Sequence, residues 1–273
     1  MPELPEVETV KETLKKKILK QKIIDIKVLY PEMIEYPDVL TFKKEIINQT
    51  INDIKRRGKW LIFELDNYYL LSHLRMEGKY NIKTNESINK HEHVIFYFND
   101  FNLRYQDTRK FGRMYLYKKE EAFNNKPLNA LGYEPWDDKL DIDYLKEKYK
   151  KITKPIKEVL LDQSIIVGIG NIYADEILFL SKINPYKKPN ELDNNELNDI
   201  IKNTRYVLEC AIKKGGTTIR TYTSSEGVHG RFQQDLLVHN QEYCKKCNSK
   251  IEVVRIGGRS TYYCPNCQKN CQK

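Results

Sequence analysis

The first regular pattern along the chain is helical. Val7, Val10, Leu14 and Ile18 recur every three or four residues between polar positions, which predicts an amphipathic helix over Glu6–Ile18. Glutamates stand at the beginning of this segment and lysines at its end, a distribution that complements the helix dipole. We therefore expect a helix that packs its apolar stripe on a larger apolar surface.

Short runs of β-branched and aromatic residues follow this helix. The expected strands are Ile23–Tyr30, Trp60–Leu65, Tyr69–Leu74, Val94–Phe98 and Met114–Tyr117. Polar pairs such as Asp66–Asn67 and Asn99–Asp100 mark turns between them. Strands at this spacing predict a two-sheet sandwich or a barrel.

Helical patterns dominate after the loop around Gly132–Asp138, and a small cysteine-bearing hairpin unit follows from about Leu236. The expected helices are Ile142–Tyr149, Pro155–Asp162, Ile172–Ser181 and Glu196–Lys214. Because the chain changes from β-rich to α-rich, we place a domain boundary near residue 135. The predicted division is residues 1–133, a linker at 134–141, a helical domain at 142–235 and a cysteine unit at 236–273.

The charge of the chain points to a class of partner. Its 273 residues include 47 Lys and Arg against 38 Asp and Glu, a formal net charge of +9. This balance suits a polyanion such as nucleic acid, although many basic proteins bind none. No apolar run reaches the roughly 18–20 residues that cross a bilayer, and the acidic start lacks the features of a signal peptide. We therefore expect a cytoplasmic protein with no membrane partner.

The cysteines predict a metal site. Cys244 and Cys247 form one C-x-x-C knuckle, and Cys264 and Cys267 form a second, with 16 residues between the two. This spacing is typical of a four-cysteine zinc ribbon, where the ion replaces the core that so short a unit lacks. A redox-active pair is the alternative. Because four thiolates leave no open coordination position, we expect one structural Zn²⁺.

Pro2 is a candidate nucleophile, since Met1 is commonly removed before a small residue. The pKa of a free α-amine is about 8, so an appreciable fraction is unprotonated at neutral pH. Attack on a sugar C1′ would give an iminium ion, which eases elimination of a phosphate. Glu3 and Glu6 lie one helical turn apart and could be its carboxyl partners. The same residues could instead simply begin a helix.

A series of motifs resembles the bacterial formamidopyrimidine-DNA glycosylases, in the order of that family and over essentially the whole chain. The motifs are Met1–Thr9, Arg57–Leu61, His73–Met76, Asp107–Gly112, Gly168–Glu176, Gly215–Thr218 and Arg259–Cys264. The resemblance implies an α+β multidomain fold. Its parts would be an N-terminal β-sandwich with a leading α-helix and a C-terminal helix–two-turns–helix domain with a four-cysteine zinc finger.

The resemblance also implies an activity. The family excises oxidised purines, such as 8-oxoguanine and formamidopyrimidines, through a Schiff base on the N-terminal proline and then cleaves the strand by β,δ-elimination. The implied partner is damaged double-stranded DNA, bound by a monomer in the bacterial cytoplasm at the nucleoid.

Individual residues of this chain match the family's functional positions. In the catalytic group, Pro2 matches the nucleophile and Glu3 the general acid/base, while Lys59 and Arg259 grip phosphates around the damaged nucleotide. The DNA-binding positions are His73 and Asn171 at phosphates, Lys157 near the lesion pocket, and the wedge residues Met76, Arg109 and Phe111, which enter the duplex. The lesion-pocket positions are Glu6, Thr217, Thr218, Arg220 and Tyr222, the last four in a lesion-capping loop at 217–232.

Taken singly, several of these residues have an ordinary structural explanation. Met76 and Phe111 could pack in a core, Asn171 could be a helix N-cap, and His73 could be a buried structural histidine. Their joint order along the chain favours the functional interpretation. A base must leave the stack before its glycosidic bond is attacked, and Met and Phe would fill the gap.

The chain departs from the family pattern at several positions. Arg75 stands where the family often has glycine, and Thr108 where it often has proline. The segment Val238–Tyr243 lacks a glycine-rich turn, and we expect Cys210 and Cys271 to be unligated.

Two other functions compete with this interpretation. An endonuclease VIII-type enzyme, which prefers oxidised pyrimidines, usually has glycine at the position of Leu4. A catalytically inert DNA-binding homologue is disfavoured by the presence of Pro2, Glu3 and Lys59.

Overall fold

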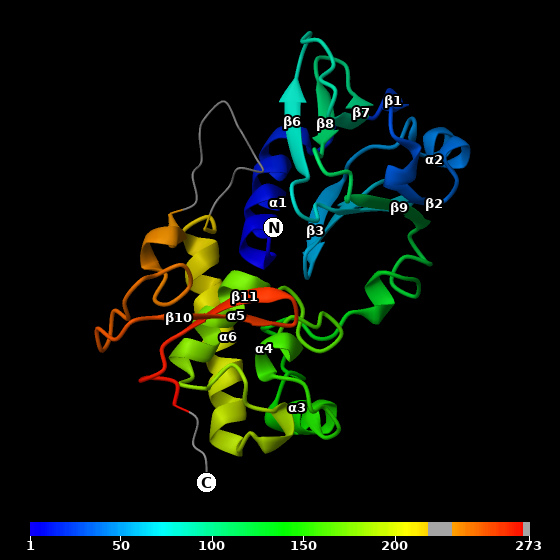
Figure 1. Cartoon of the computed structure of the whole chain (residues 1–273). Coiled ribbons are helices and arrows are strands. Elements are labelled where there is room, and N and C mark those ends of the chain that lie inside the picture. Colours follow the sequence, from blue (N-terminus) through cyan, green and yellow to red (C-terminus); the bar gives the residue numbers. More distant parts are fainter. Residues whose placement is uncertain (218–230, 270–273) are drawn as a thin grey trace. The chain divides into compact units, whose positions relative to one another are not determined.

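The computed structural model describes residues 1–217 and 231–269. These residues pack into two compact units (Figure 1). The first holds residues 1–130 with Gly215–Thr217, and the second holds residues 131–214 with 231–269. Among the described helices, none is both long and apolar enough to span a bilayer.

The first unit begins with α1 (Leu4–Ile18), which confirms the predicted amphipathic helix and extends it by two residues. Glu3 and Glu6 form a reciprocal capping box at its start, so the acidic N-terminal pattern is explained by satisfied backbone N–H groups. The predicted apolar stripe is buried and packs against β3 and β4.

Two sheets build the rest of this unit, which confirms the predicted two-sheet architecture. One sheet has the order β2 (Ile34–Tyr36), β9 (Arg113–Lys118), β5 (Tyr68–His73), β4 (Trp60–Glu64) and β3 (Asp53–Arg57). The other has the order β1 (Asp25–Val28), β7 (Glu92–Tyr97), β8 (Asn102–Gln106) and β6 (Lys79–Lys83). All pairings are antiparallel except β2 with β9. One apolar core joins residues of both sheets with α1 and the short helix α2 (Val39–Ile46).

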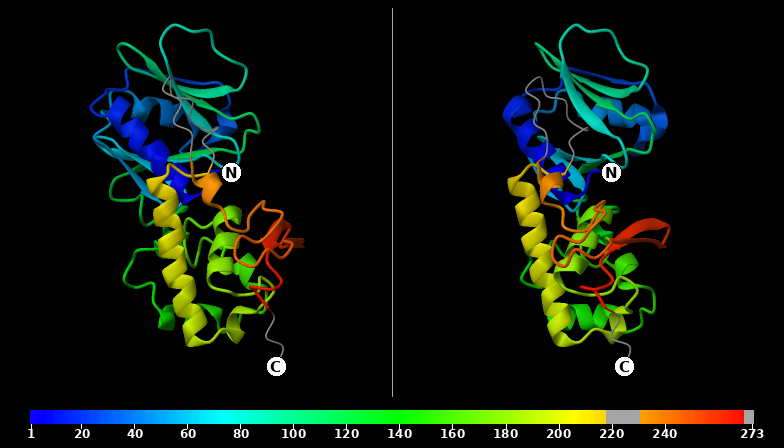
Figure 2. Two further views of the ribbon diagram at one scale, coloured as in Figure 1. Left: turned by 90° about the vertical axis from the view of Figure 1, so that its left-hand side faces the viewer. Right: turned by 60° about the vertical axis from the view of Figure 1, so that its left-hand side comes forward.

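The second unit is helical with one hairpin. Its elements are α3 (Ile142–Tyr149), α4 (Ile156–Val159), α5 (Asn171–Leu180), α6 (Asn194–Lys213), β10 (Glu252–Ile256) and β11 (Arg259–Tyr263). Both views in Figure 2 place α5 between α6 and the hairpin, in agreement with the contacts of α5 on each side. This central position explains why α5 is apolar over most of its surface.

The cysteine hairpin packs directly on the helices of the second unit. Phe179 of α5, Val238 and Ile251 form an apolar cluster with Cys244 and Cys264. This packing joins the helical segment and the cysteine unit, which the predicted division treats separately. The predicted boundaries at 134–141 and 235 stay a prediction.

Candidate active site and DNA-binding residues

The start of α1 presents the predicted reactive group. Pro2 is buried directly before the helix, and Glu3 and Glu6 are 2% and 3% exposed. The Glu3 N–H donates to Glu6 Oε2 at 2.8 Å, and the Glu3 side chain accepts from the N–H of Glu6. Because Pro2 is joined to Met1, its nitrogen becomes an amine only when Met1 is removed.

The other oxygen of Glu6 binds the segment that leads into the predicted capping loop. Glu6 Oε1 accepts from the N–H of Thr217 at 2.9 Å and from its hydroxyl at 3.2 Å. Gly216 has a φ of +82°, and a Cβ there would lie 2.5 Å from Glu6 Oε1. Glycine is therefore required for this close approach. The structure brings Glu6 and Thr217 together, whereas Thr218, Arg220 and Tyr222 lie outside the described residues.

Lys59 lies in the tight turn between β3 and β4. The preceding Gly58 has a φ of +56°, and its carbonyl accepts from Arg56 Nη1 at 2.9 Å. Arg56 Nε donates to Glu8 Oε2 on α1 at 2.8 Å, so the turn is tied to the helix that carries Glu3. The Lys59 side chain is 6% exposed. The Lys59 side chain is therefore held by packing and is not a mobile surface lysine.

His73 ends β5 as a buried, neutral imidazole. Its Nδ1 accepts from the N–H of Arg75 at 2.9 Å, so the proton of the neutral ring is on Nε2. Burial, followed by the charges of Arg75 and Lys59, lowers the pKa of His73 to about 3. The ring packs edge-on against Trp60, with centroids 4.7 Å apart. His73 can therefore offer a phosphate a hydrogen bond but no charge at neutral pH.

The predicted wedge residues lie on two loops of the first unit. Asp107 is fully buried, and its carboxylate accepts from the N–H groups of Arg109, Phe111 and Gly112 at 3.0, 2.9 and 2.8 Å. Phe111 is 46% exposed and lies under the guanidinium of Arg109, 4.8 Å from the ring centroid. This exposure contradicts the core-packing explanation for Phe111.

Tyr105 connects the two wedge loops. Its hydroxyl occupies the space where a Cβ of Gly78 or Gly112 would be, at 2.1 and 1.9 Å. Gly78 closes the loop that carries Met76, and Gly112 closes the loop that carries Phe111. Both loops thus rest on one buried side chain, so their relative positions are set within the first unit.

In the second unit, Asn171 and Arg259 are brought together from distant parts of the sequence. Asn171 begins α5 and donates from Nδ2 to the Ser260 carbonyl at 2.9 Å, next to Arg259. Because the N-cap is Gly170, the N-cap explanation for Asn171 is wrong. Arg259 is exposed and follows a two-residue turn, Gly257–Gly258, whose φ angles are +53° and +76°. Positive φ at both central residues is characteristic of a tight two-residue hairpin turn, and glycine adopts this conformation easily.

Lys157, a predicted DNA-binding residue, lies inside the second unit. Its side chain is fully buried, and Nζ donates to the Asn171 carbonyl at 2.7 Å and pairs with Asp175 Oδ1 at 2.5 Å. The bond to the Asn171 carbonyl supports the start of α5, and a buried ammonium requires a counter-charge such as that of Asp175. The DNA-binding role of Lys157 stays a prediction.

Two acidic residues of α5, which sequence reasoning missed, bind the C-terminal part of the second unit. Asp175 Oδ2 accepts from His239 Nδ1 at 2.6 Å and from the Tyr262 N–H at 3.2 Å. Glu176 accepts from three backbone N–H groups at residues 237–239, while its burial raises its pKa. Their position in the motif Gly168–Glu176 was the only available signal.

The four predicted metal ligands converge. The Sγ atoms of Cys244, Cys247, Cys264 and Cys267 lie within 4.8 Å of one another, with the closest pairs at 3.5–3.8 Å. A zinc ion with Zn–S bonds of about 2.3 Å requires tetrahedral edges of about 3.8 Å. The donor set therefore fits zinc. Cys210 belongs to α6 and lies outside this group, and Cys271 falls outside the described residues.

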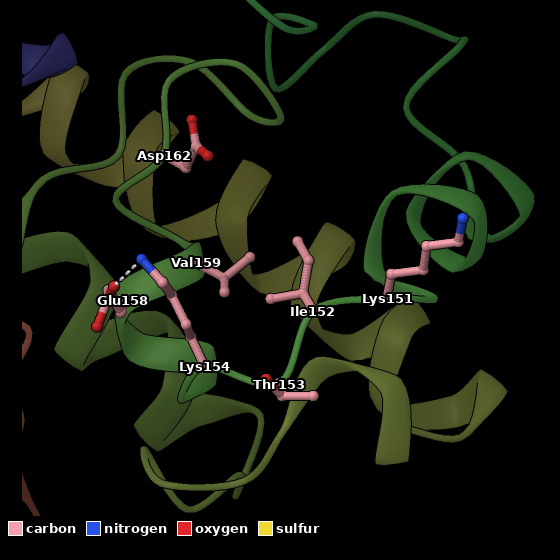
Figure 3. A pocket seen from close by; sticks show the side chains of 7 residues that line it. All are labelled: Lys151, Ile152, Thr153, Lys154, Glu158, Val159 and Asp162. Atoms are coloured by element: carbon pink, nitrogen blue, oxygen red, sulfur yellow. Dashed lines mark ion pairs between the residues drawn. The ribbon is translucent and has the colours of Figure 1, made fainter.

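A pocket of about 410 Å³ in the second unit contains none of the predicted site residues (Figure 3). It is lined by Lys151, Ile152, Thr153, Lys154, Glu158, Val159 and Asp162. Lys154 is paired with Glu158 at 2.7 Å, and Ile152 and Val159 supply apolar lining. Nothing in this lining links the pocket to the predicted chemistry.

Three family models match the chain in succession. They are the formamidopyrimidine-DNA glycosylase N-terminal domain at residues 1–114, the H2TH domain of the same family at 131–223, and a zinc finger found in FPG and IleRS at 241–270. With the four clustered cysteines, the last match shows a structural zinc.

Whole-chain relatives agree with these models. The formamidopyrimidine-DNA glycosylase of Oceanobacillus iheyensis is 48% identical, over 100% of this chain and 99% of that protein. One from Bacillus cereus is 46% identical, over 98% of this chain and 99% of that protein.

The fold is similar to solved DNA complexes of a homologous enzyme. A Lactococcus lactis FPG mutant bound to DNA containing Fapy-dG superposes with a TM-score of 0.93 at 41% identity, over 98% of this chain and 100% of that chain. The Lactococcus lactis Fpg bound to DNA with an abasic site gives a TM-score of 0.91 at the same identity and coverage.

Proposed function

Because the chain belongs to the formamidopyrimidine-DNA glycosylase family and is a DNA glycosylase for oxidised purines, we propose that Pro2 and Glu3 perform its chemistry. The observation that carries this proposal is the start of α1. Pro2 immediately precedes two buried carboxylates, and the capping box fixes the first of them against the second.

The proposed reaction begins after Met1 has been removed. The Pro2 amine attacks C1′ of the damaged nucleotide, and the bond from C1′ to the base breaks as Glu3 delivers a proton on the side of the leaving group. The C1′–O4′ bond of the sugar then opens, O4′ takes a proton, and an iminium ion joins C1′ to Pro2. This ion acidifies the proton at C2′, whose loss expels the 3′ phosphate by β-elimination. A second elimination expels the 5′ phosphate, and hydrolysis of the imine frees Pro2.

We further propose how DNA is held for this reaction. Lys59 and Arg259 neutralise phosphates, while the neutral His73 and Asn171 donate hydrogen bonds to them. Met76, Arg109 and Phe111 fill the gap left by the extruded nucleotide, whose unstacking costs a few kcal/mol. The exposure of Phe111 and the carboxylate clamp of Asp107 support this role.

The cellular setting follows from the substrate. A monomer that acts on damaged chromosomal DNA would work in the bacterial cytoplasm at the nucleoid, with no membrane partner. The relatives that match over the whole chain are bacterial enzymes, which supports this setting.

One cleavage experiment tests the assignment. Purified protein is incubated with duplexes that each carry one lesion: 8-oxoguanine, a formamidopyrimidine or an oxidised pyrimidine. We expect cleavage at both purine lesions, with the oxidised pyrimidine cut at least tenfold more slowly. Preferred cleavage at the pyrimidine would favour the endonuclease VIII-type alternative, and binding without cleavage would favour an inert homologue.

A substitution tests the proton transfer proposed for Glu3. Glu3→Gln keeps the shape of the side chain but cannot transfer a proton, so base excision should fall by at least a hundredfold while lesion binding remains. Glu12→Gln on the solvent side of α1 is the matched control and should cleave like the wild type. Excision by Glu3→Gln at the wild-type rate would refute the acid/base assignment.

A further inference from the structure

Arg75 has an unusual backbone for an arginine. Its φ is +54°, a left-handed conformation that costs a residue with a Cβ about 1–2 kcal/mol. It lies between His73, a proposed phosphate contact, and Met76, a proposed wedge residue. Strained residues persist where the surrounding structure or a function requires them.

The other left-handed residues have ordinary explanations. Among the described residues, seven other than glycine have positive φ: Lys20, Asn48, Arg75, Lys110, Lys182, Asn240 and Asn248. Lys20, Asn48 and Lys182 each stand two positions after the last residue of a helix, where left-handed residues commonly end helices. Asn240 and Asn248 are of a residue type that tolerates this conformation.

Lys110 and Arg75 remain, each directly before a wedge residue. The ammonium of Lys110 lies over the Tyr30 ring, 4.5 Å from its centroid, so its side chain has a partner within the fold. Arg75 differs, because its side chain is exposed and its guanidinium has no hydrogen-bond or ion-pair partner in the described part of the chain. Packing therefore does not account for an arginine at this position.

The neighbours of Arg75 define what it would meet. Its N–H fixes the His73 ring with Nε2 as the donor, and its charge, with that of Lys59, acts on His73. The neutral donor His73 and the cations Arg75 and Lys59 thus share a small region. This combination of groups fits an anion. The wedge loop on the other side of Arg75 would bring DNA to the same place.

We propose that Arg75 is a further DNA-contacting residue, whose guanidinium binds a backbone phosphate beside the one held by His73 and Lys59. The proposal rests on the DNA-binding role proposed for this loop. Glycine would be less strained at this position. In this account the arginine is kept because its exposed guanidinium supplies a cation to the DNA.

The salt dependence of binding tests the proposal. Each phosphate contact by a charged residue contributes about −0.9 to the slope of log K against log salt. Lys59 and Arg259 account for about −1.8, and Arg75 would make the slope about −2.7. The probe is a duplex with a tetrahydrofuran abasic analogue, which cannot be cleaved, and binding is measured by fluorescence anisotropy from 50 to 200 mM salt.

Three substitutions at Arg75 test whether its charge sets the slope. Arg75→Gly and Arg75→Asn should flatten the slope by about 0.9, while Arg75→Lys should retain it. Over this range of salt, the wild type should lose about threefold more affinity than either neutral variant. Because glycine and asparagine suit the left-handed backbone, the melting temperature of these variants should be equal to or above that of the wild type.

Lys20→Gly is the matched control, because it removes one exposed cation from a left-handed residue of the same unit, at the far end of α1 from Pro2. It should leave the slope unchanged. The proposal would be overturned if Arg75→Gly left the slope unchanged, or if Lys20→Gly changed it as much. A melting temperature of Arg75→Gly below that of Lys20→Gly would also overturn it, because Arg75 would then support the fold. Lys59→Ala distinguishes failure of the Arg75 proposal from failure of the proposed function on which it rests. If Lys59→Ala also leaves the slope unchanged, the phosphate contacts proposed for the first unit are wrong.

Discussion

At the scale of single residues, burial decides which side chains of the site carry charge. His73 is the clearest case, since desolvation and two neighbouring cations hold its pKa at about 3. Lys157 shows another outcome of burial, because it is fully buried and pairs with the equally buried Asp175. The sequence identifies both residues but indicates neither state, which depends on packing by segments distant in the chain.

The state of His73 makes stability depend on pH. In the unfolded chain this histidine has a pKa near 6.5, whereas in the folded protein its pKa is about 3. Between these values the unfolded chain binds the extra proton, so stability is lost as pH falls from about 6.5 towards 3. His73→Gln, which lacks this proton, should gain about 2 kcal/mol relative to the wild type between pH 7.5 and pH 5.

Urea unfolding of both proteins at pH 7.5, 6 and 5 measures this difference, and all other titrating groups cancel in the comparison. A constant difference across the three pH values would show that His73 has an ordinary pKa.

At the scale of elements, the loops that carry the predicted wedge residues are shaped by one carboxylate of their own and by one side chain of the neighbouring strand β8. Asp107 binds three backbone N–H groups of its own loop, and Tyr105 fills the space beside two glycines.

Most helices and five strands were evident from periodicity. Four strands of the first unit, β2, β3, β6 and β8, were not. β2 has only three residues, β3 is rich in charged residues, and the other two bury polar side chains such as Asn81, Asn102 and Arg104. The pattern of a strand weakens when its inward positions are polar.

The Asp107 clamp yields a prediction. Asp107→Asn turns one acceptor oxygen into a donor that faces backbone N–H groups, so the loop should lose its fixed shape. Cleavage of 8-oxoguanine paired with cytosine should fall about tenfold. A lesion that is already unstacked, opposite an unpaired gap, needs no wedge and should be cleaved nearly as fast as by the wild type.

Asp38→Asn provides the control, since Asp38 also accepts from two backbone N–H groups, at the start of α2 in the same unit. It should leave both substrates unaffected. If Asp107→Asn slows cleavage of the unstacked lesion as much as that of the paired one, the clamp supports the fold in general rather than the wedge.

At the scale of the whole molecule, the metal site shares one packing unit with Asn171 and Arg259, two of the residues proposed to bind phosphates. Asp175 of α5 binds the hairpin that carries Arg259, Glu176 binds the segment at residues 237–239 that leads to the cysteines, and the apolar cluster around the cysteines packs on α5. The C-x-x-C spacing sufficed to predict zinc. The anchoring by α5 was not predictable, because it joins residues more than 60 positions apart.

Loss of zinc should therefore affect one unit selectively. Cys264→Ser should abolish zinc binding and weaken binding to the abasic analogue at least tenfold, because Arg259 loses its support. The sandwich should stay folded, since its core contains no residue of the second unit. Metal content, anisotropy and hydrogen exchange of the sandwich strands test these three statements. Full binding by the zinc-free variant would contradict them.

The central claim is that the amine of Pro2 attacks the damaged nucleotide, and borohydride trapping followed by mass spectrometry of the digested adduct tests it most directly. We predict that the trapped DNA is attached to the N-terminal peptide at Pro2. A protein with one additional residue before Pro2 should fold and bind the abasic analogue but give no trapped adduct, because its Pro2 nitrogen remains an amide. An adduct on Lys59, or full trapping by the extended protein, would contradict the mechanism.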